Sequence, residues 1–121
     1  MSFKTDELAR LLKILSVGTR VRIVRFLKGH SLCVNALASQ LDVTQGAVSQ
    51  HLRVMRDAGL VSGEKRGHYV HYRLNEETLA AWREQIDRLL DPTVGDCTEK
   101  KGARRCVAAT RRRKAAGNRR T

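Results

Sequence analysis

Residues 41–60 read LDVTQGAVSQHLRVMRDAGL, and this stretch decides the fold. Thr44 is a residue type that commonly caps the start of a helix, because its side-chain oxygen accepts a hydrogen bond from a free backbone N–H. Val43 before this cap and Val48 after it are spaced to form a hydrophobic staple, which sets the angle at which the chain enters the helix. Gly59 can take the left-handed conformation that ends a helix. The stretch therefore predicts a tight turn followed by a helix capped at both ends.

The predicted helix has an apolar and a polar face. Val48, Leu52 and Met55 share one stripe when residues are placed about every 100° around the helix. The opposite side carries Gly46, Ser49, Gln50 and Arg53. His51 lies nearer the apolar stripe and is expected to brace the helix against the segment that follows. A shorter amphipathic helix precedes the turn, and two helices joined in this way are typical of a helix-turn-helix.

The polar face carries side chains suited to reading DNA bases. In the major groove Gln50 matches adenine and Arg53 matches guanine, and Ser49 lies beside them. Thr44 and Gln45 begin the helix, where contact with a phosphate and contact with a base are both expected. The alternative is an ordinary solvated helix face, which the caps, the staple and the following hairpin make less favoured.

The flanking segments complete the pattern of elements. Helices are predicted over about residues 8–15, 19–28 and 33–41, and from Asn75 as N-cap up to Pro92. Residues 69–74 alternate as in a strand, and Gly67 supplies the turn of a hairpin. The predicted fold is mostly α with a small β-hairpin wing, a winged helix-turn-helix.

Further basic residues flank the predicted helix-turn-helix. Lys65, Arg66 and His68 form the hairpin tip, where a phosphate or minor-groove contact is expected beside such a motif. An ordinary charged turn is the alternative. Arg20 and Arg22 are additional candidates for phosphate contact, and Arg20 alternatively braces the first two helices.

The composition restricts the class of protein. The 121 residues are 41% hydrophobic and 30% charged, which suits one small domain. Lys and Arg number 24 against 12 Asp and Glu, so the net charge is +12 and a polyanion is the first partner to consider.

No apolar stretch approaches the roughly 20 residues of a membrane span. Three cysteines without an export signal predict reduced thiols in the cytoplasm.

The positive charge is uneven along the chain. Residues 1–90 carry 14 basic and 9 acidic side chains, a net charge of +5, and residues 91–121 carry 10 and 3, a net charge of +7. The second stretch has almost no large apolar residues with which to build a core. We therefore predict a folded domain over residues 1–91 and a basic arm, disordered when free, over residues 92–121.

Several motifs resemble the ArsR/SmtB family of bacterial and archaeal winged-helix repressors. The matching stretches are residues 12–16 (LKILS), 19–24 (TRVRIV), 48–61 (VSQHLRVMRDAGLV), 65–67 (KRG) and 70–74 (VHYRL). The resemblance covers about residues 7–90. It implies a transcriptional repressor that binds double-stranded operator DNA and leaves it when a thiophilic or borderline metal binds.

The resemblance also implies a homodimer joined by the first and last helices. The apolar residues expected to form that interface are Leu8, Leu12, Leu15, Trp82, Ile86 and Leu89. Together they exceed what the core of a small monomer can absorb. The folded domain is thus expected to serve both DNA binding and dimerisation.

The cysteines match the metal-sensing members of the family only in part. Arsenic-sensing members carry Cys-Val-Cys at the start of the first helix of the motif, and here that stretch reads Cys33-Val34-Asn35. Other members hold zinc on the last helix through Asp and His, but residues 75–90 contain no His and no Cys. Cys97 and Cys106 lie in the basic arm with eight residues between them, which matches no compact zinc motif.

Three thiolates suit a pyramidal As(III) or Sb(III) ion, and the chain has three cysteines. We expect no obligatory cofactor, and As(III), Sb(III) or another soft metal as an inducer held by Cys33, Cys97 and Cys106. Two alternatives stay open. One is a thiol redox or persulfide switch, and the other is a regulator whose cysteines sense nothing.

No enzymatic function is expected from the sequence. It shows no nucleophile–base constellation, no phosphate-binding glycine loop and no paired carboxylates in an apolar setting. The rival from another class is a general DNA-binding or DNA-compacting protein, which the basic arm favours. A repressor prefers one inverted repeat over random DNA by about three or more orders of magnitude, and a compacting protein does not.

Overall fold

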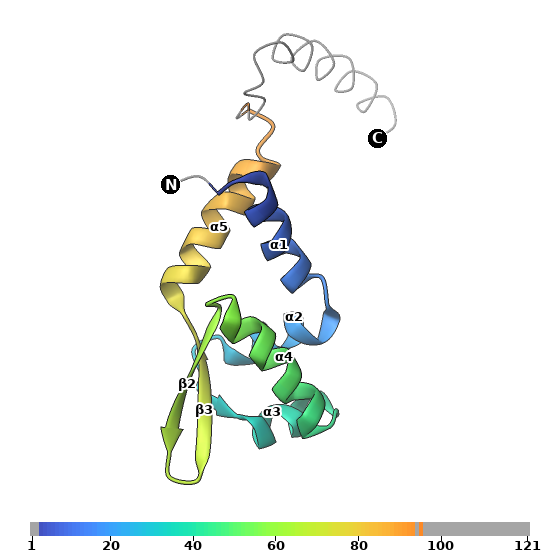
Figure 1. The fold of residues 1–121 in the computed structure, drawn as a ribbon, viewed down its shortest axis with the longest axis vertical. Coiled ribbons are helices and arrows are strands. Elements are labelled where there is room, and N and C mark those ends of the chain that lie inside the picture. The colour runs from blue at the N-terminus through green and yellow to red at the C-terminus, as the bar shows by residue number, and fades with distance from the viewer. Residues whose placement is uncertain (1–2, 94, 96–121) are drawn as a thin grey trace. The chain divides into compact units, whose positions relative to one another are not determined.

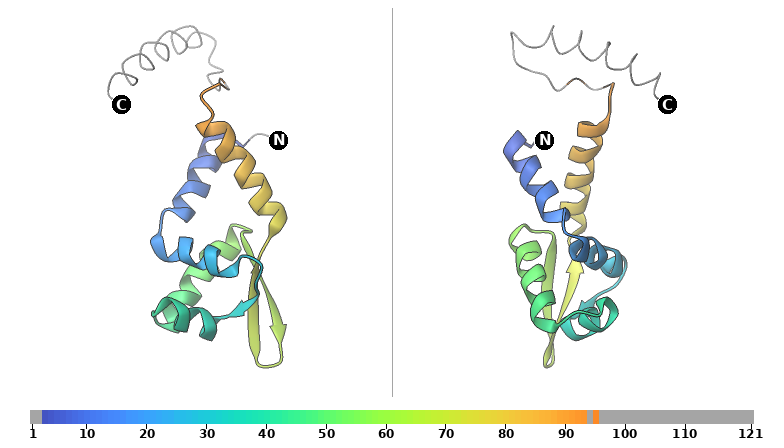
Figure 2. Two further views of the ribbon diagram at one scale, coloured as in Figure 1. Left: turned by 180° about the vertical axis from the view of Figure 1, so that it is seen from behind. Right: turned by 90° about the vertical axis from the view of Figure 1, so that its right-hand side faces the viewer.

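The computed structural model describes residues 3–93 and residue 95, and these residues form five helices and one three-stranded sheet. The elements are α1 (Thr5–Leu15), α2 (Gly18–Leu27), β1 (Leu32–Cys33), α3 (Val34–Leu41), α4 (Gln45–Asp57), β2 (Val61–Arg66), β3 (Tyr69–Leu74) and α5 (Glu76–Leu90). Figures 1 and 2 show α3 and α4 beside the long β2–β3 hairpin. The prediction of a winged helix-turn-helix is confirmed.

Residues 1–87 cluster into one compact unit, and a second unit begins at Arg88, near the end of α5. The basic arm, with Cys97 and Cys106, lies almost entirely outside the described residues. The predicted boundary at residue 91 therefore stays a prediction.

Helix α4 is capped at both ends as the sequence predicts. Thr44 is the N-cap, and its Oγ1 accepts a 3.1 Å hydrogen bond from the backbone N–H of the third helical residue. At the other end Gly59 has a φ of +79°. The Leu60 N–H donates to the Met55 carbonyl at 2.9 Å, and the Gly59 N–H donates to the Arg56 carbonyl at 2.8 Å. These two bonds form a Schellman motif, so local hydrogen bonds define where α4 begins and ends.

The inner face of α4 lies in the hydrophobic core. Val48, Leu52 and Met55 are 0%, 1% and 0% exposed. The other buried members of the core are Leu11, Ile23, Leu27, Leu37, Ala38, Leu41, Leu60, Val61, Leu74 and Trp82. Every described helix and the hairpin contribute to this cluster, so α4 has one orientation in which its apolar stripe is buried.

The wing is a β-hairpin with a two-residue turn. Strands β2 and β3 pair antiparallel from Val61 opposite Leu74 to Arg66 opposite Tyr69. The turn begins at Gly67, as predicted, and its φ of +64° is a conformation that glycine adopts without strain. Val61 and Leu74 are buried, and they anchor the base of the hairpin to the core while the tip extends into solvent.

The sheet contains a third strand that sequence analysis missed. Strand β1 lies on the free side of β3, where Leu32 pairs with Tyr72 and Cys33 pairs with His71. The prediction that residue 33 lies within the third helix is therefore wrong by one position. Cys33 is the N-cap of α3 and has the extended backbone of a strand. Two residues are too few to show the alternation that identifies a strand in a sequence.

Arg20 of α2 joins three helices. Its Nε donates to His51 Nδ1 of α4 at 3.2 Å, and its Nη1 donates to the Ile14 carbonyl of α1 at 3.3 Å. Burial, and secondly the positive charge of Arg20, lower the pKa of His51 from its usual 6.5. The alternative in which Arg20 is a brace is confirmed. The prediction that His51 braces α4 against the hairpin is wrong, because its hydrogen-bond partner lies on α2.

Asn75 joins the end of the wing to the end of α4. Its Nδ2 donates to the Gly59 carbonyl at 2.6 Å, and its Oδ1 accepts a 2.9 Å bond from Ser62 Oγ. Asn75 also directly precedes α5, and its carbonyl accepts a 3.0 Å hydrogen bond from the Leu79 N–H, as expected of the predicted N-cap residue. Its side chain satisfies a carbonyl left free at the end of α4 and a hydroxyl at the start of β2.

We expect Leu52→Ala to destabilise the protein by about 2–5 kcal/mol, because it removes a fully buried side chain and leaves a cavity. Arg53→Ala, at the exposed neighbouring position, should change the free energy of unfolding by no more than about 0.5 kcal/mol. Urea denaturation of both variants measures these values. Equal effects would contradict the assigned inner face of α4.

We expect His51 to make folding less favourable in acid. A histidine whose pKa is lowered by folding binds its proton more weakly in the folded state than in the unfolded state. Its contribution to stability is therefore fully present above the unfolded pKa of about 6.5 and is lost as the pH falls through and below that value. Urea unfolding at about pH 8 and about pH 5 should show a smaller loss for His51→Gln than for the parent. An equal loss would assign the pH dependence to other groups.

Candidate nucleic-acid interface

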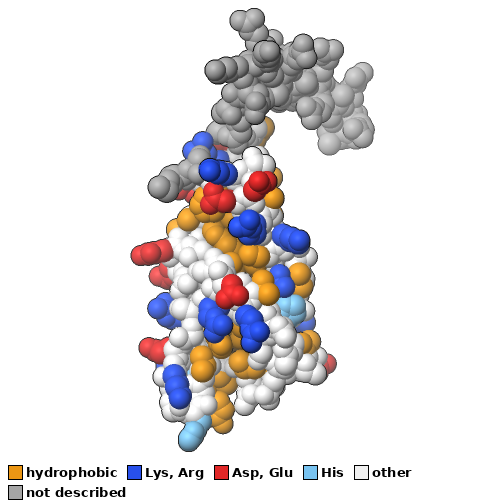
Figure 3. All heavy atoms as spheres, viewed as in Figure 1, with side chains coloured by type: hydrophobic (Ala, Val, Ile, Leu, Met, Phe, Trp, Pro, Cys, Tyr) orange, Lys and Arg blue, Asp and Glu red, His pale blue; other side chains and the backbone are white. Residues whose placement is uncertain are grey.

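All eight residues predicted to contact DNA are exposed in the structure. They are Thr44, Gln45, Ser49, Gln50, Arg53, Lys65, Arg66 and His68. The first five lie at the start of α4 or along it, and the other three lie at the tip of the hairpin. Figure 3 shows Lys and Arg side chains spread over the face that carries α4 and the hairpin.

The outward face of α4 follows from the burial of its inner face. Because Val48 and Leu52 are buried, Ser49, Gln50 and Arg53 are turned to the opposite side of the same helix. These three side chains offer a hydroxyl, an amide and a guanidinium. This is a donor and acceptor set that matches base edges in a major groove.

The start of α4 is suited to an anion. The first backbone N–H groups of a helix have no helical partner, and the Thr44 side chain satisfies one of them. Gly46 is exposed, and a Cβ added there would meet nothing within 4 Å. The backbone is therefore open to a phosphate group, which the helix dipole also favours.

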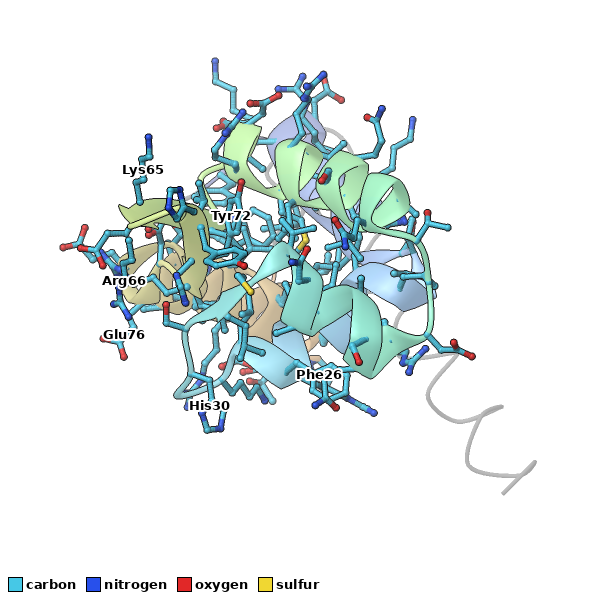
Figure 4. All side chains as sticks on the ribbon, turned by 90° about the horizontal axis from the view of Figure 1, so that it is seen from below. Phe26, His30, Lys65, Arg66, Tyr72 and Glu76 are labelled. Carbon is cyan, nitrogen blue, oxygen red and sulfur yellow. The ribbon has the colours of Figure 1, made fainter. Side chains whose placement is uncertain are left out.

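The hairpin tip presents its basic side chains to solvent. Figure 4 shows Lys65 and Arg66 projecting outward, whereas Tyr72 points into the domain. Arg66 is not free, because its Nη2 lies 2.9 Å from Glu64 Oε1 and its Nε donates to the same oxygen at 3.0 Å. Sequence analysis missed this pair, although residues two apart on a strand share a face. Both side chains are more than half exposed, so the pair contributes little to stability and can exchange for a phosphate.

Tyr69 is a surface residue that sequence analysis did not single out. Its side chain is 52% exposed, and it lies directly opposite Arg66 on the hairpin. An aromatic ring beside the basic tip adds apolar surface to this end of the wing. Its place in an alternating strand pattern gave no sign of this exposure.

Arg20 and Arg22 are engaged within the domain. Arg20 donates hydrogen bonds to the Ile14 carbonyl and to His51. Arg22 Nη1 donates at 3.5 Å to the carbonyl of Leu41, the last residue of α3. Both arginines thus support the helices that carry the interface, and their predicted phosphate contacts stay a prediction.

Cys33 is the one cysteine that the described residues contain, and it is half-buried. As N-cap of α3 it makes no side-chain capping bond. Among the described residues no group of three or more His, Cys, Asp or Glu side chains is placed to hold a metal ion. The structure therefore does not test the predicted three-cysteine site, because Cys97 and Cys106 lie outside the described residues.

Within residues 3–93, no helix has both the length and the apolar character that a bilayer crossing requires.

Comparisons with known proteins agree with this architecture. Residues 18–62, from the start of α2 to the start of β2, match the family described as "Bacterial regulatory protein, arsR family". The chain is 41% identical over 75 residues to the HTH-type transcriptional repressor SmtB of Mycobacterium tuberculosis, covering 62% of this chain and 56% of that protein. It thus spans little more than half the length of this relative.

Two further comparisons cover other proteins. The arsenical resistance operon repressor of Escherichia coli is 41% identical over 78 residues, which cover 64% of this chain and 66% of that protein. The solved structure of reduced HlyU from Vibrio cholerae has a TM-score of 0.60 and 33% identity, and the match covers 72% of this chain and 92% of that one. The matched family is described as regulatory, and SmtB and the Escherichia coli protein are named repressors, which confirms the prediction that the chain is not an enzyme. The chain belongs to the bacterial arsR family of regulatory proteins.

Proposed function

We propose that this protein is a transcriptional repressor that binds a specific operator in double-stranded DNA. One observation carries the proposal: α4 buries Val48, Leu52 and Met55 and presents Ser49, Gln50 and Arg53 to solvent. Helix α4 enters the major groove, and its amino-terminal end receives a phosphate. The hairpin lies along the adjacent backbone with Lys65, Arg66 and His68.

The names of the matched relatives support this proposal. SmtB and the Escherichia coli protein are both named repressors. The net charge of +12 favours any polyanion and supplies sequence-independent affinity. Specificity comes from α4, because phosphate contacts orient a protein on DNA but do not read its sequence. A general DNA-compacting protein would share the charge and lack the specificity.

Two copies of the chain bind two half-sites as a homodimer. Leu12 of α1 is 38% exposed, and Leu89 and Leu90 of α5 are 44% and 72% exposed. We assign these leucines to the contact between the two copies, where their burial would remove apolar surface from water. Trp82 does not support the dimer, because it is 7% exposed and belongs to the core of the single chain.

An inducer bound at Cys33 releases the operator. We infer As(III), Sb(III) or another soft metal, with Cys97 and Cys106 as further thiolate ligands. Cys33 supports this role by its position, since it is the N-cap of α3 and α3 packs against α4. Loss of DNA affinity on binding corresponds to a coupling free energy of about 1–3 kcal/mol.

We expect Gln50→Ala and Arg53→Ala each to weaken operator binding by about 1–3 kcal/mol and to relax sequence preference. Lys65→Ala is the matched control, because loss of a phosphate contact weakens binding to every sequence alike. Fluorescence anisotropy with an operator duplex and a scrambled duplex measures both affinities. An unchanged ratio between the two duplexes in the α4 variants would overturn the assignment of α4 to the major groove.

We expect the protein to sediment as a dimer at micromolar concentration. Leu12→Asp should shift it toward the monomer, because it places a charge at the proposed interface, whereas Lys13→Asp on the same helix should not. Sedimentation velocity distinguishes the two. A parent protein that is monomeric would contradict the proposed dimer.

We expect Cys33→Ser to bind the operator like the parent and to stay bound when As(III) is added. Serine keeps most of the side-chain volume and removes the soft ligand. Operator release is followed by anisotropy during As(III) titration, with Cys97→Ser and Cys106→Ser measured in parallel. Release at parental concentrations in Cys33→Ser would remove Cys33 from the sensing site.

A further inference from the structure

We propose that Cys33 and His71 form a two-donor metal site between β1 and β3, suited to a soft monovalent cation such as Cu(I) or Ag(I). The inference deepens the proposed function, because it rests on Cys33 being the inducer site and names a second ligand there. His71 does not appear among the ligands that the sequence predicts.

The strand register brings the two side chains together. Cys33 and His71 are directly opposed in the antiparallel pairing of β1 with β3. Opposed residues in such a pair project to the same face of the sheet, with Cβ atoms about 4.5–5.5 Å apart. Zinc, for comparison, bonds to sulfur at about 2.3 Å and to imidazole nitrogen at about 2.0 Å, and bonds of this order from one ion to the two side chains fit the spacing.

The His71 ring has a donor atom that the described protein leaves unused. Its Nδ1 is buried and has no hydrogen-bond partner among the described residues. A buried nitrogen without a partner is rare in folded proteins, and a bound ion is one reason for it to persist. Glu64, the other cross-strand neighbour of His71, is exposed and paired with Arg66, whereas Cys33 is half-buried. We therefore infer that the buried Nδ1 of His71 faces Cys33 rather than Glu64.

The donor set selects the class of ion. One thiolate and one imidazole suit soft or borderline metal ions, whereas carboxylates and carbonyls suit hard ones. Structural Zn²⁺ takes four ligands, and the described residues contain no cluster of even three candidate ligands. A cation that accepts two donors therefore fits this pair better than Zn²⁺. On binding, the Cys33 thiol releases its proton to solvent, and the thiolate sulfur bonds to the metal ion in its place.

The site also has a route to the DNA-binding elements. Cys33 is the N-cap of α3, which packs against α4, and His71 lies on β3, the strand that follows the wing tip. A metal bond between the two ties the helix-turn-helix to the wing. Any change in their relative position alters both sets of DNA contacts at once.

The test uses the full chain with Cys97→Ser and Cys106→Ser, so that Cys33 is its one thiol. Ag(I), a probe that does not change oxidation state, is titrated calorimetrically in chloride-free buffer. We expect one equivalent to bind, Cys33→Ser to abolish this binding, and His71→Asn to weaken it at least tenfold. His68→Asn, at the exposed wing tip, is the matched control and should bind Ag(I) like its parent.

A second measurement does not depend on any histidine variant. In the same parent, the ¹⁵N resonance of His71 Nδ1 should shift on addition of Ag(I), while that of His68 should not. Unchanged Ag(I) affinity in His71→Asn, or an unmoved Nδ1 resonance, overturns the proposal.

Operator binding by the metal-free protein is measured separately. If it prefers the operator over scrambled DNA, a failed silver titration refutes only this site, and if it does not, the proposed repressor function fails.

Discussion

The burial of one stripe of α4 is the constraint on which the rest of this structure depends. Val48, Leu52 and Met55 are almost completely removed from water, and the helix between its two caps is a rigid cylinder. Rotating α4 by one residue would expose this stripe and bury polar side chains, which costs free energy on both counts. Ser49, Gln50 and Arg53 therefore face solvent because of where the stripe lies, independently of any partner.

Two sets of polar contacts hold this arrangement in place. Arg20 connects α1, α2 and α4 through Ile14 and His51, and Asn75 connects the end of α4 to the base of the wing. Helix-turn-helix and wing are thus joined by specific hydrogen bonds in addition to apolar packing. This matters for the proposed repressor function, because DNA recognition requires the helix and the wing to keep a set distance along the duplex.

The place of Cys33 in the fold gives the two proposals a common physical basis. It ends a strand and caps a helix at once, so its backbone belongs to the sheet and to the helix-turn-helix together. A ligand bound there acts on both elements, whereas a ligand on the exposed tip of the wing would act on one. The buried nitrogen of His71 adds a donor that the three cysteines alone do not provide.

The sequence by itself determined the order of the five helices and the hairpin, both caps of α4, the turn at Gly67 and the exposure of all eight predicted DNA contacts. These features are local, since helix caps, turns and faces depend on residues within a few positions of each other. Only the tertiary structure decided the partners of Arg20, Asn75 and His71, and the burial of Trp82 in the single chain. Arg20 and His51 are 31 positions apart, and no periodicity in a sequence encodes which side chains meet across such a separation.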